Sequence, residues 1–296
     1  MKHDQGKVSR RTFIGGTAAL AASTLIPTQA RAANNMKPNS KINGVQIGTI
    51  TYSFRSMPST AEDLLKYLVE CNLNSVELMG GPAEAFAKKH TPETGEDGPM
   101  DGYEALRKMY NDAGVDIHIV KFGDIGEKHM SDKRIEYYFR AAKALGAKGI
   151  TREMSTPIAK RLGPIADKHE IIIAFHNHTE ITPDYYDGPV LTYGKYLGIN
   201  LDIGHYVAGT NQSPIPLIEK HHDRILSMHL KDRKKNDGPN MPWGQGDTPI
   251  AKVLQLVKKN QWPIYADIEL EYKIPAGSDA VKEVMKCRRY CEEALA

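Results

Sequence analysis

The sequence predicts an α/β protein with a (β/α)8 TIM barrel. Four short apolar runs end in groups that can bind a metal or move a proton: Phe175-His176-Asn177-His178, Asp202-Ile203-Gly204-His205, His229-Leu230-Lys231-Asp232 and Glu269. Such runs, roughly 25 to 40 residues apart, are typical of barrel strands whose C-terminal ends form a functional rim. The 296 residues are enough for one barrel of about 250 residues, so no second domain is required.

The N-terminal segment has the features of an export signal. Ser9-Arg10-Arg11-Thr12-Phe13-Ile14 resembles the twin-arginine signature, and a mildly apolar run leads to a small-x-small site at Ala30-Arg31-Ala32. The apolar run is too short and too weak to be a stable membrane anchor. We expect a periplasmic protein with three segments: a twin-arginine signal peptide at 1–32, a loose leader at 33–41 and a single barrel domain at 42–296.

The charge of the chain is concentrated in that signal segment. The formal charge is +3, but residues 1–32 hold five Lys/Arg and one acid, so the remainder has 34 bases and 35 acids and a charge of −1. We therefore expect no nucleic acid or membrane surface as a partner. The three cysteines are too few and too poorly spaced for a disulfide framework, so we expect free thiols.

The first half of the barrel is expected to alternate short β-rich runs with helices. Thr60 is placed to cap a helix that continues to Val69. Residues 80–101 are rich in Gly, Pro, Lys and His, and are expected to form an irregular loop with a short helix over the rim. The remaining expected elements are strands at 45–52, 75–79, 116–122 and 149–153, and helices near 103–113 and 132–145.

The second half continues the alternation. We expect a helix at 156–169, strand five from 171, strand six around 199–201, strand seven from 224 or 225, strand eight at 263–270, and helices at 214–222, 248–260 and 279–295. Eight strands favour a closed barrel over an open doubly wound sheet. No Gly-x-Gly-x-x-Gly follows the first strand, so a dinucleotide cofactor is not indicated.

The strand ends bring carboxylates and imidazoles to one opening. Side chains alternate along a strand, so His176 and His178 face the same way, and Asp267 is in phase with Glu269. The residues offered to the opening are Glu153, His176, His178, Asp202, His229 and Glu269. Carboxylates combined with imidazoles suit Mn²⁺, Co²⁺, Mg²⁺ or Zn²⁺, and the lack of a rim cysteine argues against a thiolate site.

These motifs resemble the sugar isomerase/epimerase superfamily with the xylose isomerase-like TIM barrel, in particular its YHNH-type branch, with Phe175 in place of the usual Tyr. The resemblance begins near Lys41 and includes Val76-Glu77-Leu78 and Gly146-Ala147-Lys148-Gly149. It implies a divalent ion held by a glutamate, an aspartate, a histidine and a second glutamate. The last three match Asp202, His229 and Glu269. Epimerases place the first glutamate on strand five, where this chain has no acid. Glu153 is therefore the candidate, with His176 or His178 as a further ligand or substrate contact.

The chemistry expected from this set is metal-assisted proton abstraction next to the carbonyl of a free sugar or keto-sugar. Glu153 or Glu269 is the expected base, His178 and His205 contact hydroxyls or relay protons, and Lys231 stabilises a negative oxygen or forms a rim salt bridge with Asp232. Tyr52, Phe54 and Trp243 are candidate faces for a sugar ring. The reaction is isomerisation or epimerisation, or alternatively elimination by a 3-keto-glycoside lyase, hydrolase or dehydratase.

Two other classes compete with a carbohydrate enzyme. Metal-dependent abasic-site endonucleases share the barrel, but the charge of −1 and the absence of an acid on strand five argue against a nuclease. A non-catalytic periplasmic sugar binder would keep the ring of polar residues but need no base. The expected partner is a small-molecule carbohydrate, and a homo-oligomer remains open.

Overall fold

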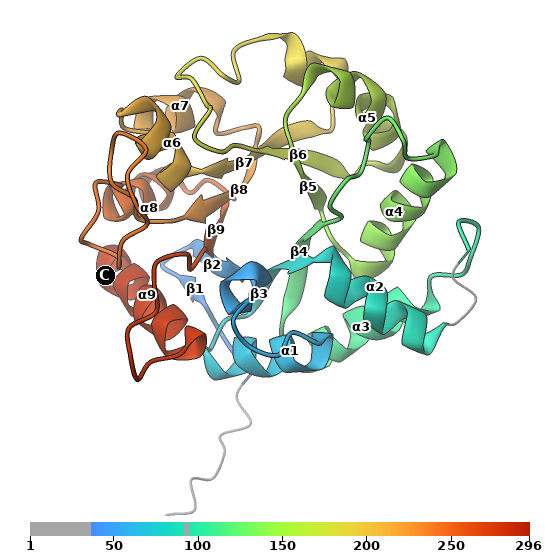
Figure 1. Ribbon diagram of the computed structural model, residues 1–296, viewed down its shortest axis with the longest axis horizontal. Coiled ribbons are helices and arrows are strands. Elements are labelled where there is room, and N and C mark those ends of the chain that lie inside the picture. The colour runs from blue at the N-terminus through green and yellow to red at the C-terminus, as the bar shows by residue number, and fades with distance from the viewer. Residues whose placement is uncertain (1–36, 92–94) are drawn as a thin grey trace, which may run out of the picture. The chain divides into compact units, whose positions relative to one another are not determined.

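The computed structural model describes residues 37–91 and 95–296, so the predicted signal peptide lies outside the described residues. Eight parallel strands, β2 to β9, follow one another around a ring that closes because β2 pairs with both β3 and β9. In Figure 1 the strands form the centre of the molecule and the helices surround them. The predicted (β/α)8 barrel is therefore confirmed.

The strands are short and largely buried on both faces, as expected for a parallel barrel covered by helices. The barrel strands are β2 Val45–Ile50, β3 Ser75–Met79, β4 Asp116–Lys121, β5 Gly149–Glu153, β6 Ile172–His176, β7 Leu197–Asp202, β8 Ile225–Leu230 and β9 Tyr265–Ile268. A two-residue strand, β1 Lys41–Ile42, pairs antiparallel with β2. The predictions at 75–79 and 149–153 match β3 and β5 exactly in their bounds.

Local capping explains why most helices were predictable. Thr60, Ser131 and Ser155 accept hydrogen bonds from backbone N–H groups three residues later, and Gly146 ends α4 in the left-handed conformation. The helices are α1 Ala61–Glu70, α2 Gly80–His90, α3 Asp101–Asp112, α4 Asp132–Leu145, α5 Thr156–His169, α6 Ile203–Thr210, α7 Ile215–His221, α8 Ile250–Asn260 and α9 Ala280–Leu295, with short 3-10 turns η1 Thr51–Phe54 and η2 Pro189–Tyr193.

Two helices differ from the sequence-based expectation. The insert at 80–101 begins with eleven helical residues, α2, because the helix packs closely on α3 despite its Gly-Gly-Pro start. Helix α6 was not predicted, and it begins directly after Asp202, whose carboxylate accepts a hydrogen bond from the His205 N–H at 2.6 Å. The Asp202–His205 motif is thus a strand end joined to a helix start.

The compact unit that contains the barrel includes residues before the expected domain boundary at 42. Residues 37–41 belong to the same compact unit as the barrel. Ser40 is fully buried, and its hydroxyl donates a hydrogen bond to Ile47 O at 2.6 Å. The last five residues of the expected leader are therefore packed against the barrel.

The barrel interior below the mouth is polar. Asp267 Oδ2 accepts a hydrogen bond from Ser227 Oγ at 2.7 Å and pairs with His118 Nε2 at 2.8 Å, while His118 Nδ1 lies 2.9 Å from Ser75 Oγ. All four side chains are buried. Asp267 therefore belongs to an enclosed network and not to the rim.

The close approach of α2 and α3 gives a test of the fold. An added Cβ at Gly102 would lie 2.4 Å from Ala87 O, so Gly102→Ala forces the two helices apart. We expect this change to lower the free energy of unfolding by about 1–3 kcal/mol in urea denaturation. Gly81→Ala is the matched control, because Gly81 is also a second helical residue but has no atom within 4 Å of the added Cβ. Equal stability of the two variants would contradict the described contact.

Candidate functional site

A cavity of about 240 Å³ opens at the C-terminal end of the barrel. Its polar lining comes from strand ends and the segments that follow them. The lining residues are Ile50, Tyr52, Met79, Lys121, His176, His178, His205, His229, Lys231, Glu269 and Glu271. Residues far apart in sequence therefore share one opening, as the strand ends predict.

His229 lies between two buried carboxylates. Its Nε2 is 2.8 Å from Glu77 Oε2 and its Nδ1 is 3.0 Å from Glu269 Oε2. Burial alone would lower the pKa of His229, but the charges of Glu269 and Glu77 outweigh burial and hold this pKa well above its usual value. In the absence of a metal, the ring is therefore an imidazolium that ties β8 to β3 and β9.

Lys231 lies next to this pair. Its Nζ is 2.9 Å from Asp202 Oδ2, 2.9 Å from Glu269 Oε2 and 2.6 Å from Glu271 Oε2. Burial would lower the pKa of Lys231, but the three carboxylates raise it well above its usual value. Lys231 also holds the pKa of Glu269 well below its usual value, against the effect of burial. The mouth thus contains a fixed ammonium beside an ionised carboxylate.

The alternative rim salt bridge between Lys231 and Asp232 is wrong. Asp232 accepts hydrogen bonds from the backbone N–H groups of Gly244, Gly246 and Thr248, at 2.8, 2.9 and 3.2 Å. The Asp232 carboxylate therefore holds the loop at 236–247. Of these two residues, Lys231 faces the mouth and Asp232 does not.

Two groups of side chains have the spacing of metal ligands. Within the described part of the chain, the candidate ligand atoms of His176, Asp202 and His229 lie within 4.8 Å of one another, as do those of His176, His178 and His205. His176 Nδ1 and Asp202 Oδ2 are buried without a hydrogen-bond partner. Asp202 Oδ2 is near Lys231 Nζ, at the distance of an ion pair, but this contact is not a directed hydrogen bond.

The buried group, His176, Asp202 and His229, has the donor atoms that a divalent cation requires. Burial, followed by the charge of His229, lowers the pKa of His176 well below its usual value, so this ring is neutral and able to bind a metal. Imidazoles combined with an aspartate suit Mn²⁺, Co²⁺ or Zn²⁺, and unpartnered buried donor atoms are what such a site leaves when no ion is bound. His176, Asp202 and His229 are therefore able to hold the expected metal.

Glu153 lies apart from this group. Its carboxylate is 2.8 Å from Lys121 Nζ and 2.7 Å from Arg152 NH1, and 3.8 Å from His178 Nε2. Burial would raise the pKa of Glu153, but His178 and Lys121 lower it well below its usual value. The side chain is 36% exposed and belongs to neither metal-spaced group. The structure brings Asp202 and His229 into one metal-spaced group and places Glu269 beside His229, but neither predicted glutamate ligand, Glu153 or Glu269, belongs to that group.

The three candidate aromatic faces lie in different places. Tyr52 is 39% exposed and lines the cavity. Phe54 is fully buried in the core, and Trp243 packs edge-on against Tyr290, 5.7 Å between ring centres. His178, with its side chain 50% exposed, also lines the cavity. Only Tyr52 among these aromatics faces the mouth.

Sequence reasoning did not assign a site role to Glu77. Glu77 is completely buried on β3 and also accepts a hydrogen bond from Asn200 Nδ2 at 2.8 Å. The available signal was an acid between Val76 and Leu78 in a short β-rich run, because a carboxylate buried in such a strand requires a partner. Glu271 and Arg233 were likewise given no role.

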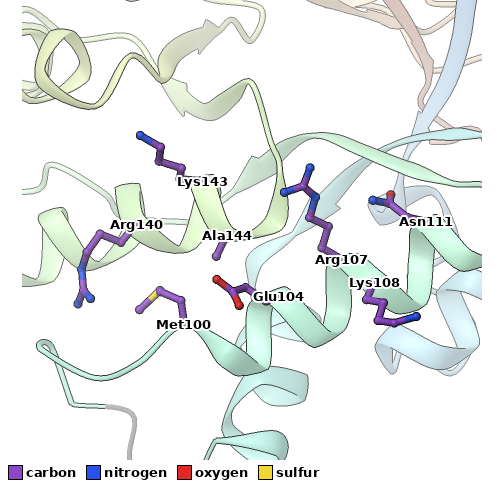
Figure 2. Close-up of a pocket in the computed structure, with 8 residues that line it drawn as sticks. All are labelled: Met100, Glu104, Arg107, Lys108, Asn111, Arg140, Lys143 and Ala144. Atoms are coloured by element: carbon purple, nitrogen blue, oxygen red, sulfur yellow. The ribbon is translucent and has the colours of Figure 1, made fainter.

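A larger hollow, about 640 Å³, lies on the outer helical layer between α3 and α4 (Figure 2). Its lining includes Arg107 and Lys108 of α3 and Arg140 and Lys143 of α4. The lining contains a single carboxylate, Glu104, and no histidine. We assign the chemistry to the barrel mouth, where buried acids, bases and candidate ligands converge.

Comparisons with known proteins agree with this architecture. The family model described as "xylose isomerase-like TIM barrel" matches residues 65–291. None of the curated proteins compared matches this chain.

Within residues 37–91 and 95–296, no helix combines the length and apolarity needed to cross a membrane.

Three solved structures with the same fold illustrate the range of described proteins. A xylose isomerase domain protein of Alicyclobacillus acidocaldarius aligns with a TM-score of 0.65 and 13% sequence identity, over 84% of this chain and 98% of that protein. A probable 3-DHS dehydratase of Bacillus anthracis aligns with a TM-score of 0.63 and 16% identity, over 82% of this chain and 98% of that protein. A sugar phosphate isomerase/epimerase of Parabacteroides distasonis aligns with a TM-score of 0.61 and 18% identity, over 83% of this chain and 93% of that protein. At these identities the likeness shows a shared fold.

The Glu77–His229 pair can be tested by its effect on stability. Glu77→Leu leaves the buried imidazolium with only one carboxylate, so we expect the metal-free protein to lose about 3–5 kcal/mol in free energy of unfolding. Glu62→Leu is the control, since Glu62 is 3.6 Å from Lys89 at the surface and should change stability by less than about 1 kcal/mol. Similar losses in both variants, measured by denaturant unfolding, would show that the buried pair is not formed.

Proposed function

Because the chain belongs to the xylose isomerase-like TIM barrel family, we propose that it is a divalent-metal-dependent carbohydrate enzyme that removes a carbon-bound proton next to a carbonyl. The observation that carries this proposal is the buried group of His176, Asp202 and His229, which lies beside Glu269 and Lys231 at the barrel mouth. This arrangement combines candidate metal ligands, an ionised carboxylate and a fixed positive charge in one cavity.

In this proposal His176, Asp202 and His229 hold the cation, and Glu269 lies beside them as the base that takes the proton. When bound, the cation polarises a carbonyl and lowers the cost of an enediolate by several kcal/mol. Glu153 receives no ligand role, because it belongs to neither metal-spaced group. The metal is one of Mn²⁺, Co²⁺, Mg²⁺ or Zn²⁺, as the mixed carboxylate and imidazole donors allow.

The chain's own residues account for the proton transfer. Glu269 is an ionised carboxylate that lines the cavity, so it is able to take the carbon-bound proton. Lys231 is positioned to stabilise the oxygen on which negative charge develops. His178 and His205 line the same cavity and supply contacts to hydroxyl groups. Tyr52 offers an exposed ring for the apolar face of a sugar.

The return of the proton determines the product. Return to the neighbouring carbon gives an isomerase, return from the opposite face gives an epimerase, and departure of a β-substituent gives a lyase or dehydratase. Elimination from a 3-keto-glycoside, the lyase outcome, is supported by the Lys231 ammonium, which lines the mouth and can donate a hydrogen bond to a leaving oxygen. The solved relatives are described as an isomerase/epimerase and as a dehydratase, which supports keeping both classes.

The proposed location of the enzyme reduces the number of candidate substrate classes. The sequence of residues 1–32 resembles a twin-arginine signal, so we place the mature enzyme in the periplasm. Sugar phosphates are rarely met there, and the proposed substrate is therefore a free sugar, a keto-sugar or an oxidised glycoside.

The reaction class is tested by solvent deuterium exchange. We expect the metal-loaded protein to incorporate deuterium at carbon in a neutral sugar or a 3-keto-glycoside, followed by NMR in deuterated water. Glu269→Gln should slow this exchange by about 10²-fold or more, because the base is lost. Glu62→Gln, a surface change, should leave the rate unchanged. If no metal-dependent exchange occurs in any of these substrates, the proposed reaction is wrong.

Metal binding itself should release a proton. His229 is protonated without metal because its pKa is raised, whereas His176 is neutral, so ligation at neutral pH should displace about one proton per ion. Calorimetric titration in two buffers of different ionisation enthalpy measures this number. Affinity should rise with pH until the raised pKa of His229 is passed. Proton-neutral binding would mean that His229 is not a ligand.

A further inference from the structure

A hollow of about 310 Å³ adjoins the mouth cavity. Glu271 lines both spaces, so its side chain belongs to a wall that they share. Because β2 and β9 pair where the barrel closes, the hollow lies beside the mouth on that side of the rim. Its other lining residues come from the segments that follow these two strands: Ser53, Arg55, Ser56, Leu270, Tyr272, Lys273 and Ile274.

Hydrogen bonds hold the two segments of the hollow together. Ser53 Oγ accepts from the Leu270 N–H at 3.0 Å, and Arg55 NH1 donates to Leu270 O at 2.6 Å. The Arg55 guanidinium also lies over the ring of Tyr52, 4.5 Å from its centre, and Tyr52 lines the mouth. The hollow is therefore a preformed space that adjoins the mouth at Glu271 and at the Tyr52–Arg55 pair.

The two spaces together have the size of a ligand site. The mouth cavity of about 240 Å³ is smaller than the roughly 300–1,000 Å³ of most small-molecule clefts, whereas the mouth and the hollow together fall within that range. A ligand that fills both spaces has two parts, one on each side of Glu271. A glycoside has this shape, and a free monosaccharide does not.

The two spaces differ in the state of their cations. Lys231 and His229, the cations of the mouth described above, already have carboxylates within ion-pair distance. Arg55 and Lys273, the cations of the hollow, have no carboxylate within that distance in the part of the chain that the structure describes. The one carboxylate of the hollow, Glu271, is 2.6 Å from Lys231 Nζ. An anionic group of a ligand therefore meets unpaired positive charge in the hollow.

We propose that this hollow is a second substrate subsite, in which Arg55 and Lys273 bind a carboxylate-bearing unit while the mouth holds the keto-sugar. Guanidinium and ammonium groups recognise carboxylates through charge-assisted hydrogen bonds. The inference rests on the proposed function for the reaction of the sugar in the mouth. It narrows the substrate to an oxidised glycoside with an anionic second unit. The bond between the two units passes Glu271 and therefore lies near the Lys231 ammonium.

Binding of unreactive glycosides tests the subsite without reference to the reaction. Phenyl glucoside and para-carboxyphenyl glucoside differ only in the carboxylate, and neither contains a ketone. In calorimetric titrations of the metal-loaded protein at low ionic strength, with both anomers, we expect the carboxylated compound to bind about fivefold more tightly. The preference should decrease in about 0.5 M salt, because the attraction is electrostatic. Equal affinities, or no binding of either carboxylated anomer, would overturn the proposal.

Variants locate the carboxylate. Lys273 is exposed and has no side-chain partner in the described chain, so Lys273→Met should fold normally and reduce the preference. Adding Arg55→Met should reduce the affinity ratio to about one. Arg107→Met is the matched control, because it removes a cation from the other hollow, between α3 and α4, and should leave the ratio unchanged. A preference that persists in Lys273→Met, or that Arg107→Met removes, places the carboxylate elsewhere and contradicts the subsite.

Turnover of the corresponding 3-keto-glycosides separates the subsite from the proposed reaction. We expect kcat/KM to be about fivefold higher for the carboxylated compound, mainly through a lower KM, and this advantage to be lost in Lys273→Met. A binding preference without any turnover would support the subsite and contradict the reaction. Turnover with equal kcat/KM for the two compounds would contradict the subsite alone.

Discussion

The ion pairs of His229 with Glu77 and Glu269 are the interaction on which the barrel mouth depends. They join β8 and the residue that follows β9 to β3, which lies on the other side of the β2–β9 pair that closes the barrel. Four carboxylates lie within ion-pair distance of the two cations His229 and Lys231: those of Glu77, Asp202, Glu269 and Glu271. Their formal charges leave an excess of two negative charges in a largely buried space, which favours the binding of a cation there.

The local secondary structure determines which partners each side chain of this network can reach. Asp202 ends β7 and caps α6, so that Oδ1 accepts the His205 N–H while Oδ2 remains without a directed hydrogen bond. Asp232, one residue beyond Lys231, is occupied by backbone N–H groups and shapes the adjacent loop. Because side chains alternate along β8 and the residues that follow it, His229 and Lys231 point into the mouth, whereas Asp232 points away from it and binds the adjacent loop.

The sequence predicts the fold and the location of the site because both follow from local patterns. Short apolar strands with polar ends identified the rim, and helix caps such as Thr60 gave helix starts. Partners across the barrel depend on strand register and tilt, which one chain's pattern does not contain. Glu77 was missed for this reason, since its partner His229 is 152 residues away. Glu153 was expected at the metal, but the cations Lys121 and Arg152 hold its carboxylate aside.

Anomalous X-ray diffraction from crystals soaked in Mn²⁺, Co²⁺ or Zn²⁺ would locate the ion at the barrel mouth without reference to any substrate. We expect one strong peak at about 2.0–2.2 Å from donor atoms of His176, Asp202 and His229. A peak on His176, His178 and His205, a peak on Glu153, or no ordered ion at the mouth at saturating metal would contradict it.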